Sequence, residues 1–343
     1  MKNIKYSIFF LILVPFFISC TVDDGSEGGG SQIPPTILAN LYATSNSASS
    51  IISYDITTNG VFLRPMGLSS NDNEGIYYDD VADELTVLSR EQKVINTYKN
   101  INNTTANSDL SLLASGGVLL NSPRDVAVKD NFYIISDNAD LDGDPNTDDG
   151  TFFIFTKDTN AYTLRNTVKV NYAVWGIELI GDDLYTTVDK TADVAVLKNF
   201  LTTYTTDVTA TPDKQITIGG ITRTHGITQD GGTVILTDIG DAQSDNDGGF
   251  QFISDFVNRF NAVADGGTLE LPGNQLRVSG SMTEMGNPVA VAYDNSSQTI
   301  FIAERLNGGG KVLFFDQIGA GGNIQPTISS VFPGASSLYF DNK

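Results

Sequence analysis

From residue 37 onward, short runs of Val, Ile, Tyr, Phe and Thr alternate with turns rich in Gly, Asn and Asp. This pattern predicts β-strands throughout, because β-branched and aromatic side chains pack well on a pleated sheet. We find no long segment with helical periodicity. In residues 252–262 the spacing of Phe252, Phe256, Val257 and Phe260 fits either a short helix or an outer strand with its turn.

The strands recur as a unit of roughly fifty residues. Each of five units has a first strand, a turn, a second strand, a polar loop and a third strand. The first strands open at Glu74-Gly75-Ile76-Tyr77, Arg124-Asp125-Val126-Ala127, Trp175-Gly176-Ile177-Glu178, His225-Gly226-Ile227-Thr228 and Pro288-Val289-Ala290-Val291. The second strands are expected at 85–88, 132–135, 184–187, 234–237 and 300–303.

The two ends of the chain complete a sixth unit. Residues 335–341 match a first strand, while 38–43, 51–55 and 61–64 match the second, third and fourth. A four-stranded unit cannot bury both of its faces alone, whereas a ring of such units can. We therefore predict an all-β, six-bladed β-propeller over residues 37–343, closed by pairing of the N- and C-terminal strands. A β-sandwich or a solenoid is the alternative.

The strand rhythm and the Gly-Ile or Pro-Val openings resemble six-bladed propellers of the NHL and gluconolactonase-like class. The resemblance implies a ligand-binding face around a central channel. The G-x-S-x-G nucleophile motif and the G-x-G-x-x-G nucleotide loop are both missing from the sequence, and we assign no catalytic residue.

The first nineteen residues have the parts of an export signal: Lys2 and Lys5, an apolar run over 7–18, and small Ser19 before Cys20. Phe17-Ile18-Ser19-Cys20 resembles the lipoprotein signal-peptidase box. The resemblance implies that residues 1–19 are removed and that Cys20 carries lipid. The alternative, a permanent membrane helix, is disfavoured because such a helix needs about 20 apolar residues.

Residues 20–36 are rich in Gly, Ser and acidic side chains, and they predict a flexible tether between the lipid and the domain. Asp23 and Asp24 resemble the acidic surface-export signal of Bacteroidota lipoproteins. The predicted location is therefore the outer membrane, with the propeller at the cell surface.

The net charge of −21 becomes −23 once Lys2 and Lys5 are removed with the signal. A charge of this sign disfavours nucleic acid and anionic lipid as partners. Cys20 is the only cysteine, so the mature chain has neither an internal disulfide nor a thiolate metal site.

In a propeller, the loop before each first strand and the loop after each second strand emerge on one face. The ligand-binding rim predicted there comprises Glu74, Arg124, Trp175, His225, Asp238, Asn287 and Glu304, with Asp137 and Asp189 beside them. His225, the only histidine, is either a base or metal ligand, or a hydrogen-bonded residue filling its position in the repeat. Trp175, the only tryptophan, either stacks on a flat ligand or packs against the next blade.

The clearest local motif lies between residues 140 and 150, where oxygen-bearing side chains alternate with other residues. The ligands predicted for a hard cation are Asp140, Asp142, Asp144, Asn146 and Asp148. The segment resembles the calcium loops of thrombospondin type 3 repeats and dockerins, which implies calcium as the cofactor. The alternative is a solvated acidic turn. Residues 238–249 form a weaker copy.

Two functions remain open. The first is a non-catalytic binding or assembly module for an outer-membrane partner protein or a glycan. The alternative, which the resemblance to gluconolactonase-like enzymes implies, is a metal-dependent lactonase or hydrolase with its site at the channel mouth, where Glu74, Asn287 and Asp238 would supply the oxygen ligands. A quinone-dependent sugar dehydrogenase is disfavoured because such a site needs a histidine base within a recognisable motif.

Overall fold

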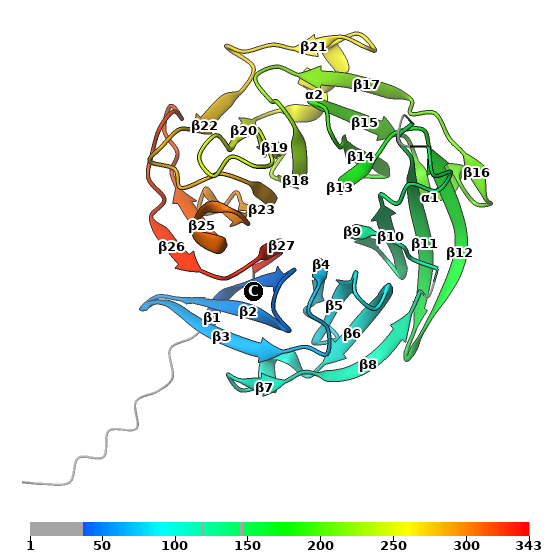
Figure 1. Cartoon of the computed structure of the whole chain (residues 1–343), viewed down its shortest axis with the longest axis vertical. Helices are drawn as coiled ribbons and strands as arrows, with labels where there is room; N and C mark the ends of the chain where they lie inside the picture. The colour runs from blue at the N-terminus through cyan, green and yellow to red at the C-terminus, as the bar shows by residue number, and fades with distance from the viewer. Residues whose placement is uncertain (1–36, 118, 145–146, 343) are drawn as a thin grey trace, which may run out of the picture. The chain divides into compact units, whose positions relative to one another are not determined.

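The computed structural model describes residues 37–117, 119–144 and 147–342. Within them, six sheets surround a central axis, as Figure 1 shows, which confirms the predicted six-bladed β-propeller. The signal peptide, Cys20, the tether and Asn146 lie outside the described residues, so the predictions for them stay predictions. None of the helices in the described ranges is long and apolar enough to cross a membrane.

The chain passes through blades 1 to 3 from the N-terminus. Blade 1 consists of β27 (Ala335–Asn342), β1 (Ile37–Ser45), β2 (Ser50–Thr57) and β3 (Gly60–Gly67). Blade 2 consists of β4 (Asn73–Asp79), β5 (Glu84–Ser89), β6 (Val94–Lys99) and β8 (Ser111–Gly116). Blade 3 consists of β9 (Pro123–Lys129), β10 (Phe132–Asp137), β11 (Gly150–Asp158) and β12 (Ala161–Val170).

Blades 4 to 6 follow the same plan. Blade 4 consists of β13 (Val174–Ile180), β14 (Asp183–Val188), β15 (Asp193–Leu197) and β17 (Lys214–Ile218). Blade 5 consists of β18 (Thr224–Asp230), β19 (Thr233–Asp238), β20 (Gly249–Ile253) and β22 (Leu276–Ser279). Blade 6 consists of β23 (Pro288–Asp294), β24 (Thr299–Glu304), β25 (Lys311–Asp316) and β26 (Ile328–Val331).

Blade 1 closes the ring with both ends of the chain. β27 pairs antiparallel with β1, and Tyr42 lies opposite Tyr339 in the register. β27 is thereby the innermost strand of blade 1, as β4 is of blade 2 (Figure 1). This pairing confirms the predicted closure and gives the terminal strand β27 a partner, which matters because unpaired strand edges invite aggregation.

The hydrophobic core is divided among the blade interfaces. Each of six clusters of buried side chains joins two neighbouring blades, for example Leu41 and Tyr54 of blade 1 with Phe301 and Phe314 of blade 6. Every blade therefore buries one face against each neighbour. This division explains why the fold is stable only as a closed ring.

Three short strands link neighbouring blades at the periphery. β7 (Ser108–Asp109) from the chain of blade 2 pairs parallel with β3 of blade 1, and β16 (Val208–Thr209) pairs in the same way with β12. β21 (Thr268–Leu269) pairs parallel with β17. Each adds backbone hydrogen bonds between blades that otherwise contact through side chains.

The helical alternative for residues 252–262 is confirmed for its second half. β20 ends at Ile253, and α2 (Phe256–Ala262) follows. Phe256 and Phe260 are fully buried and pack edge-on against Tyr185 of blade 4. The other helical segments are η1 (Ile101–Asn103), α1 (Phe200–Thr203) and η2 (Asn307–Gly309).

Candidate functional site

Four side chains at equivalent positions of consecutive blades form a continuous row around the channel mouth, which we call the belt: Glu74, Arg124, Trp175 and His225. Glu74 and Arg124 lie 3.8 Å apart, and the Arg124 guanidinium carbon lies 4.1 Å from the centroid of the Trp175 ring. The Trp175 and His225 rings stack with centroids 3.7 Å apart and planes 8° apart. Because two groups cannot both lie this close to one face of an indole, Arg124 and His225 occupy opposite faces.

The belt residues are placed by a repeated backbone arrangement. Inner strands β4, β13 and β18 carry a bulge near their first residues, and a glycine follows the belt residue in each. A Cβ at Gly176 would lie 2.5 Å from the carbonyl oxygen of His225. The Thr187 hydroxyl accepts the Gly176 N–H at 2.8 Å and donates to the His225 carbonyl at 2.7 Å. Blades 4 and 5 are thus held close enough for Trp175 and His225 to stack.

His225 is positioned by Asp189, whose Oδ1 lies 3.0 Å from its Nε2. Burial lowers the pKa of His225 to about 4 even though Asp189 acts to raise it, so the ring is neutral at pH 7 and its Nε2–H donates to Asp189. For Asp189 burial acts to raise the pKa, but the bonds from His225 and Arg223 outweigh it and lower the pKa to about 2. His225 is only 2 % exposed, and its Nδ1 has no hydrogen-bond partner among the described residues. This geometry fits a positioning role better than that of a solvent-facing base.

Carboxylates at the ends of second strands support the loops that enter the first strands. Asp238 accepts the N–H groups of Thr222 and Arg223 and pairs with Arg277 at 2.8 Å. Glu304 accepts the N–H of Asn287 at 2.9 Å, and Asp137 supports its own blade in the same way. Asp238, Asn287 and Glu304 are all buried. Their polar groups are directed into the loops. The repeat predicted that Asn287 would lie at the rim in blade 6, but the position equivalent to His225 is occupied by Val289.

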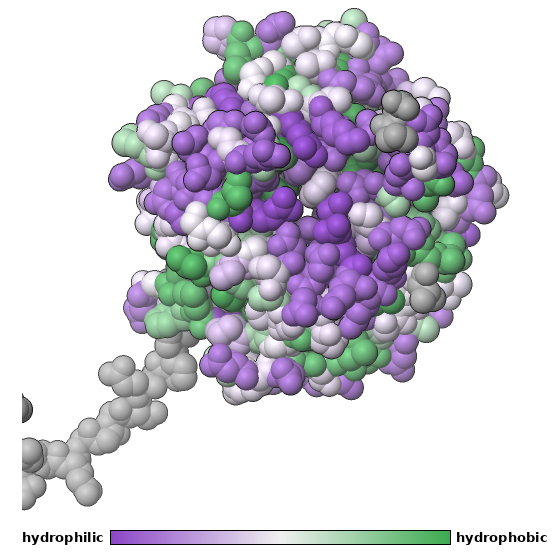
Figure 2. All heavy atoms as spheres, viewed as in Figure 1, coloured by the Kyte–Doolittle hydropathy of each residue, from purple (hydrophilic) through white to green (hydrophobic). Residues whose placement is uncertain are grey.

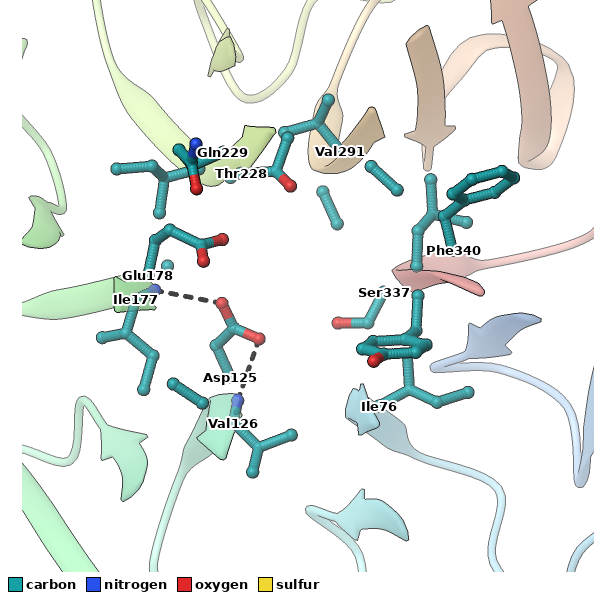
Figure 3. A pocket seen from close by; sticks show the side chains of 18 of the residues that line it. Ile76, Asp125, Val126, Ile177, Glu178, Thr228, Gln229, Val291, Ser337 and Phe340 are labelled. Carbon is teal, nitrogen blue, oxygen red and sulfur yellow. Dashed lines mark hydrogen bonds between the residues drawn. The ribbon is translucent and has the colours of Figure 1, made fainter. Parts of the chain in front are cut away.

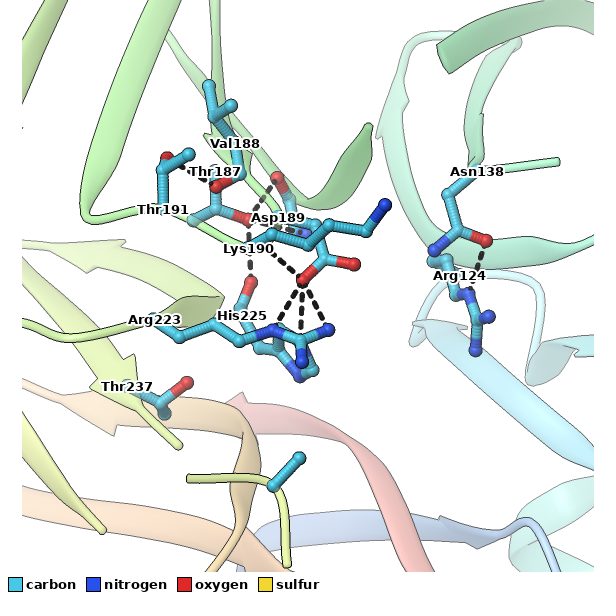
Figure 4. Close-up of polar contacts among 12 residues, drawn as sticks. Arg124, Asn138, Thr187, Val188, Asp189, Lys190, Thr191, Arg223, His225 and Thr237 are labelled. Carbon is cyan, nitrogen blue, oxygen red and sulfur yellow. Dashed lines mark hydrogen bonds and ion pairs between the residues drawn. The ribbon is translucent and has the colours of Figure 1, made fainter. Parts of the chain in front are cut away.

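Arginine side chains surround the belt. The repeat pattern predicted only one of them, Arg124. Arg90 lies 3.7 Å from Glu74, and Arg223 binds Asp189 at 2.8 Å. Burial raises the pKa of Glu74 to about 7, although the guanidinium groups of Arg124, Arg90 and Arg305 act to lower it. Figure 4 shows Arg223 and His225 both directed at Asp189, with Arg124 bound to Asn138.

The acidic loop after β10 brings together fewer of the predicted ligands than expected. Carboxylate oxygens of Asp140, Asp142 and Asp149 lie within 4.8 Å of one another, which fits a hard cation. Asp149 was not among the predicted ligands. The predicted Asp148 pairs instead with Lys190, and Asp144 donates its backbone N–H to Asp142 at 2.8 Å.

The central channel contains a cavity of about 410 Å³ lined by the six inner strands. Asp125 and Glu178 point into it from neighbouring blades, as Figure 3 shows. The carboxylate of Asp125 accepts the N–H groups of Val126 at 2.9 Å and Ile177 at 3.0 Å. Burial raises the pKa of Asp125 to about 6; for Glu178 burial and then the Asp125 charge raise it to about 8. The only sequence signal for this pair was an acidic residue within each of two inner strands, β9 and β13.

Comparisons with known proteins extend the fold assignment and leave the function open. No family model matches the chain, and no curated protein matches it. A chain from the crystal structure of a nidogen/laminin complex superposes with a TM-score of 0.58 at 11 % identity, covering 88 % of this chain and 98 % of that one. A putative 6-phosphogluconolactonase from Bacteroides fragilis has a TM-score of 0.56 at 9 % identity, with the same coverage of 88 % and 98 %. At these identities the likeness concerns the fold alone.

Proposed function

We propose that the propeller is a non-catalytic binding module, anchored to the outer membrane by lipid on Cys20 and facing the cell surface. Its ligand is a carboxylate-bearing group of a partner protein or a glycan, received at the channel mouth. The observation that carries the proposal is the charge of the mouth. There Arg90, Arg124, Arg223 and Arg305 lie beside Asp72, Glu74 and Asp189, although the chain as a whole has a net charge of −21.

The chemistry of these groups suits carboxylate recognition. A guanidinium presents a planar fork of N–H donors that matches a carboxylate. The side chains of Arg90 and Arg223 remain 25 % and 27 % exposed, so both keep donors available to a ligand. Hydrophilic side chains also gather around the central opening on the face shown in Figure 2.

The belt holds part of this surface rigid before a ligand arrives. Arg124 is fixed by Trp175, Glu74 and Asn138, so little side-chain freedom is left to lose on binding. A preformed surface of this kind supports a binding module. One structural neighbour was solved in a complex between two proteins and the other is a putative lactonase, so the neighbours do not decide between the two functions.

The alternative, a metal-dependent lactonase or hydrolase, would use Glu74, Asn287 and Asp238 as metal ligands. Glu74 faces guanidinium groups, and Asp238 is bound by loop N–H groups and Arg277. Asn287 donates its side-chain N–H to Ala242 and keeps one buried oxygen without a partner. Because Glu74 and Asp238 already have other partners, this arrangement favours binding over catalysis.

Affinity isolation of the intact protein from gently solubilised membranes tests the proposal. We would compare the wild type with Arg223→Gln/Arg305→Gln and with Lys99→Gln/Lys198→Gln. The second pair removes the same charge at the opposite end of blades 2 and 4. A stoichiometric protein partner that is lost only with the arginine variant supports recognition at the mouth. Binding of the same variants to an array of neutral and uronic-acid glycans tests whether the carboxylate belongs to a glycan. Equal binding by both variants, or turnover of lactones by the wild type, would overturn the proposal.

A further inference from the structure

The central channel contains two carboxylates that lack a cationic partner. Among the residues that line the described cavity, Arg124 is the only Lys, Arg or His, and its guanidinium is held in the belt by Trp175 and Asn138. Within the described residues, Asp125 accepts only backbone N–H groups, and Glu178 accepts the backbone N–H of Gln229 and makes no ion pair. Two carboxylates that face the same partly desolvated cavity repel each other unless a cation or a proton joins them.

A hydroxyl group provides a second, independent sign of a ligand. Ser337 of β27 is only 6 % exposed. Its backbone N–H donates to Thr44, but its hydroxyl has no partner within the described structure. In Figure 3 this hydroxyl points into the cavity, toward the side that holds Asp125 and Glu178. The hydroxyl faces the open space of the cavity, where a polar ligand can supply its hydrogen-bond partner.

The remaining wall indicates the kind of cation. Most of the other lining residues are aliphatic or aromatic, such as Ile76, Val291 and Phe340 in Figure 3, although polar atoms make up the larger part of the cavity surface. A calcium ion would need six to eight oxygen ligands, whereas the side chains of Asp125, Glu178 and Ser337 together offer five at most. An alkylammonium group needs only three acceptors and brings its own apolar surface. The cavity volume of about 410 Å³ lies in the range typical of small-molecule sites.

We propose that the channel binds a small organic amine in its ammonium form. Its three N–H groups bond to Asp125, Glu178 and Ser337, and its carbon chain lies against the apolar wall. This site is separate from the proposed carboxylate site at the mouth, so either proposal can be wrong while the other is right.

The electrostatics of the channel support this ligand. Burial and the Asp125 charge raise the pKa of Glu178 to about 8, so the ionised pair is costly without a neutralising cation. Asp230 and Asp294 line the same cavity at the end away from the belt. They add negative charge where a cation would enter, and a field of this sign raises the local concentration of cations.

The test is isothermal titration of the full-length protein at pH 8.5 with butylamine, 1,4-diaminobutane and 2-phenylethylamine. Butanol and butyrate serve as uncharged and anionic controls, and calcium and magnesium chloride test the metal alternative. Fluorescence of Trp175 gives a second readout, because the only tryptophan of the chain lines the cavity. The variants are Glu178→Gln, Ser337→Ala and, as a matched control on the surface, Glu270→Gln.

We expect saturable 1:1 binding of at least one amine, weakened by about tenfold or more in Glu178→Gln because one charge partner is lost. Ser337→Ala should weaken it less, and Glu270→Gln should leave it unchanged. A cooperative melt of Glu178→Gln at a Tm no lower than that of the wild type would show that the loss is not unfolding. Absence of binding by all three amines, equal binding in Glu178→Gln, or binding of the divalent ions alone would each overturn the proposal.

Discussion

Replacing Glu178 by Gln should stabilise the unliganded propeller, and more so as the pH rises. The ordinary pKa of a glutamate is 4.5, and burial raises that of Glu178 to about 8. While Glu178 is protonated in both the folded and the unfolded state, it does not lower the free energy of unfolding. Its cost grows as the pH rises above 4.5 and is complete above about 8.

The magnitude follows from this difference in pKa. At 1.36 kcal/mol for each pKa unit, the full cost of ionising Glu178 in the folded state would be about 5 kcal/mol. Glu178 is only partly buried, and water in the cavity screens its charge. We therefore expect about 2–3 kcal/mol at pH 8.5 and under about 1 kcal/mol at pH 5. For a domain of this size, that corresponds to a rise in Tm of about 3–5 °C at the higher pH.

Differential scanning calorimetry at pH 5.0 and 8.5, in buffers without amines, measures this effect. Glu270→Gln removes an exposed carboxylate and should leave Tm within about 1 °C of the wild type at both values. Burial also raises the pKa of Asp125. The Tm of Glu178→Gln should therefore still fall as the pH rises, but by less than the Tm of the wild type. A gain in Tm that is equal at both pH values, or a loss at pH 8.5, would refute the assignment of a costly charge to Glu178.

Two further predictions concern the acidic loop and the lipid anchor. Calcium at about a hundred times its Kd should raise the free energy of unfolding by about 2.7 kcal/mol, and Asp142→Ala with Asp149→Ala should abolish this gain in thermal melts. A parent protein whose melting does not respond to calcium would contradict the metal site. Cys20→Ala should move the protein from the membrane fraction to the soluble fraction, because the anchor depends on acyl chains. Retention in washed membranes would point to another anchor.

The ring closure could be predicted because it depends on local patterns. Alternating apolar positions marked Leu41 and Leu338 as parts of strands, and the number of strands at each end completed one blade. The outer strands were harder to identify. β22 follows α2 after a long connection, and β12 carries as many polar as apolar side chains because its outer face meets solvent.

The partners of the site residues could not be predicted in the same way. The stacking of Trp175 on His225 joins residues about fifty positions apart, and it depends on how tightly two blades approach at Gly176. Asp238 and Glu304 were placed correctly at the mouth end of their strands. Sequence position alone could not show that loop N–H groups occupy their carboxylates.

The two proposed sites share one physical cause, a separation of charge along the channel. Guanidinium groups gather at the mouth beside Arg124, while Asp125 and Glu178 lie deeper and Asp230 lies at the far end. The order follows from the inner strands, which all run in the same direction, so that early residues lie at the mouth and late residues at the other end. Since Arg124 is held between Glu74 and Trp175, it cannot reach down to neutralise Glu178, and the channel carboxylates stay available to a cation from outside.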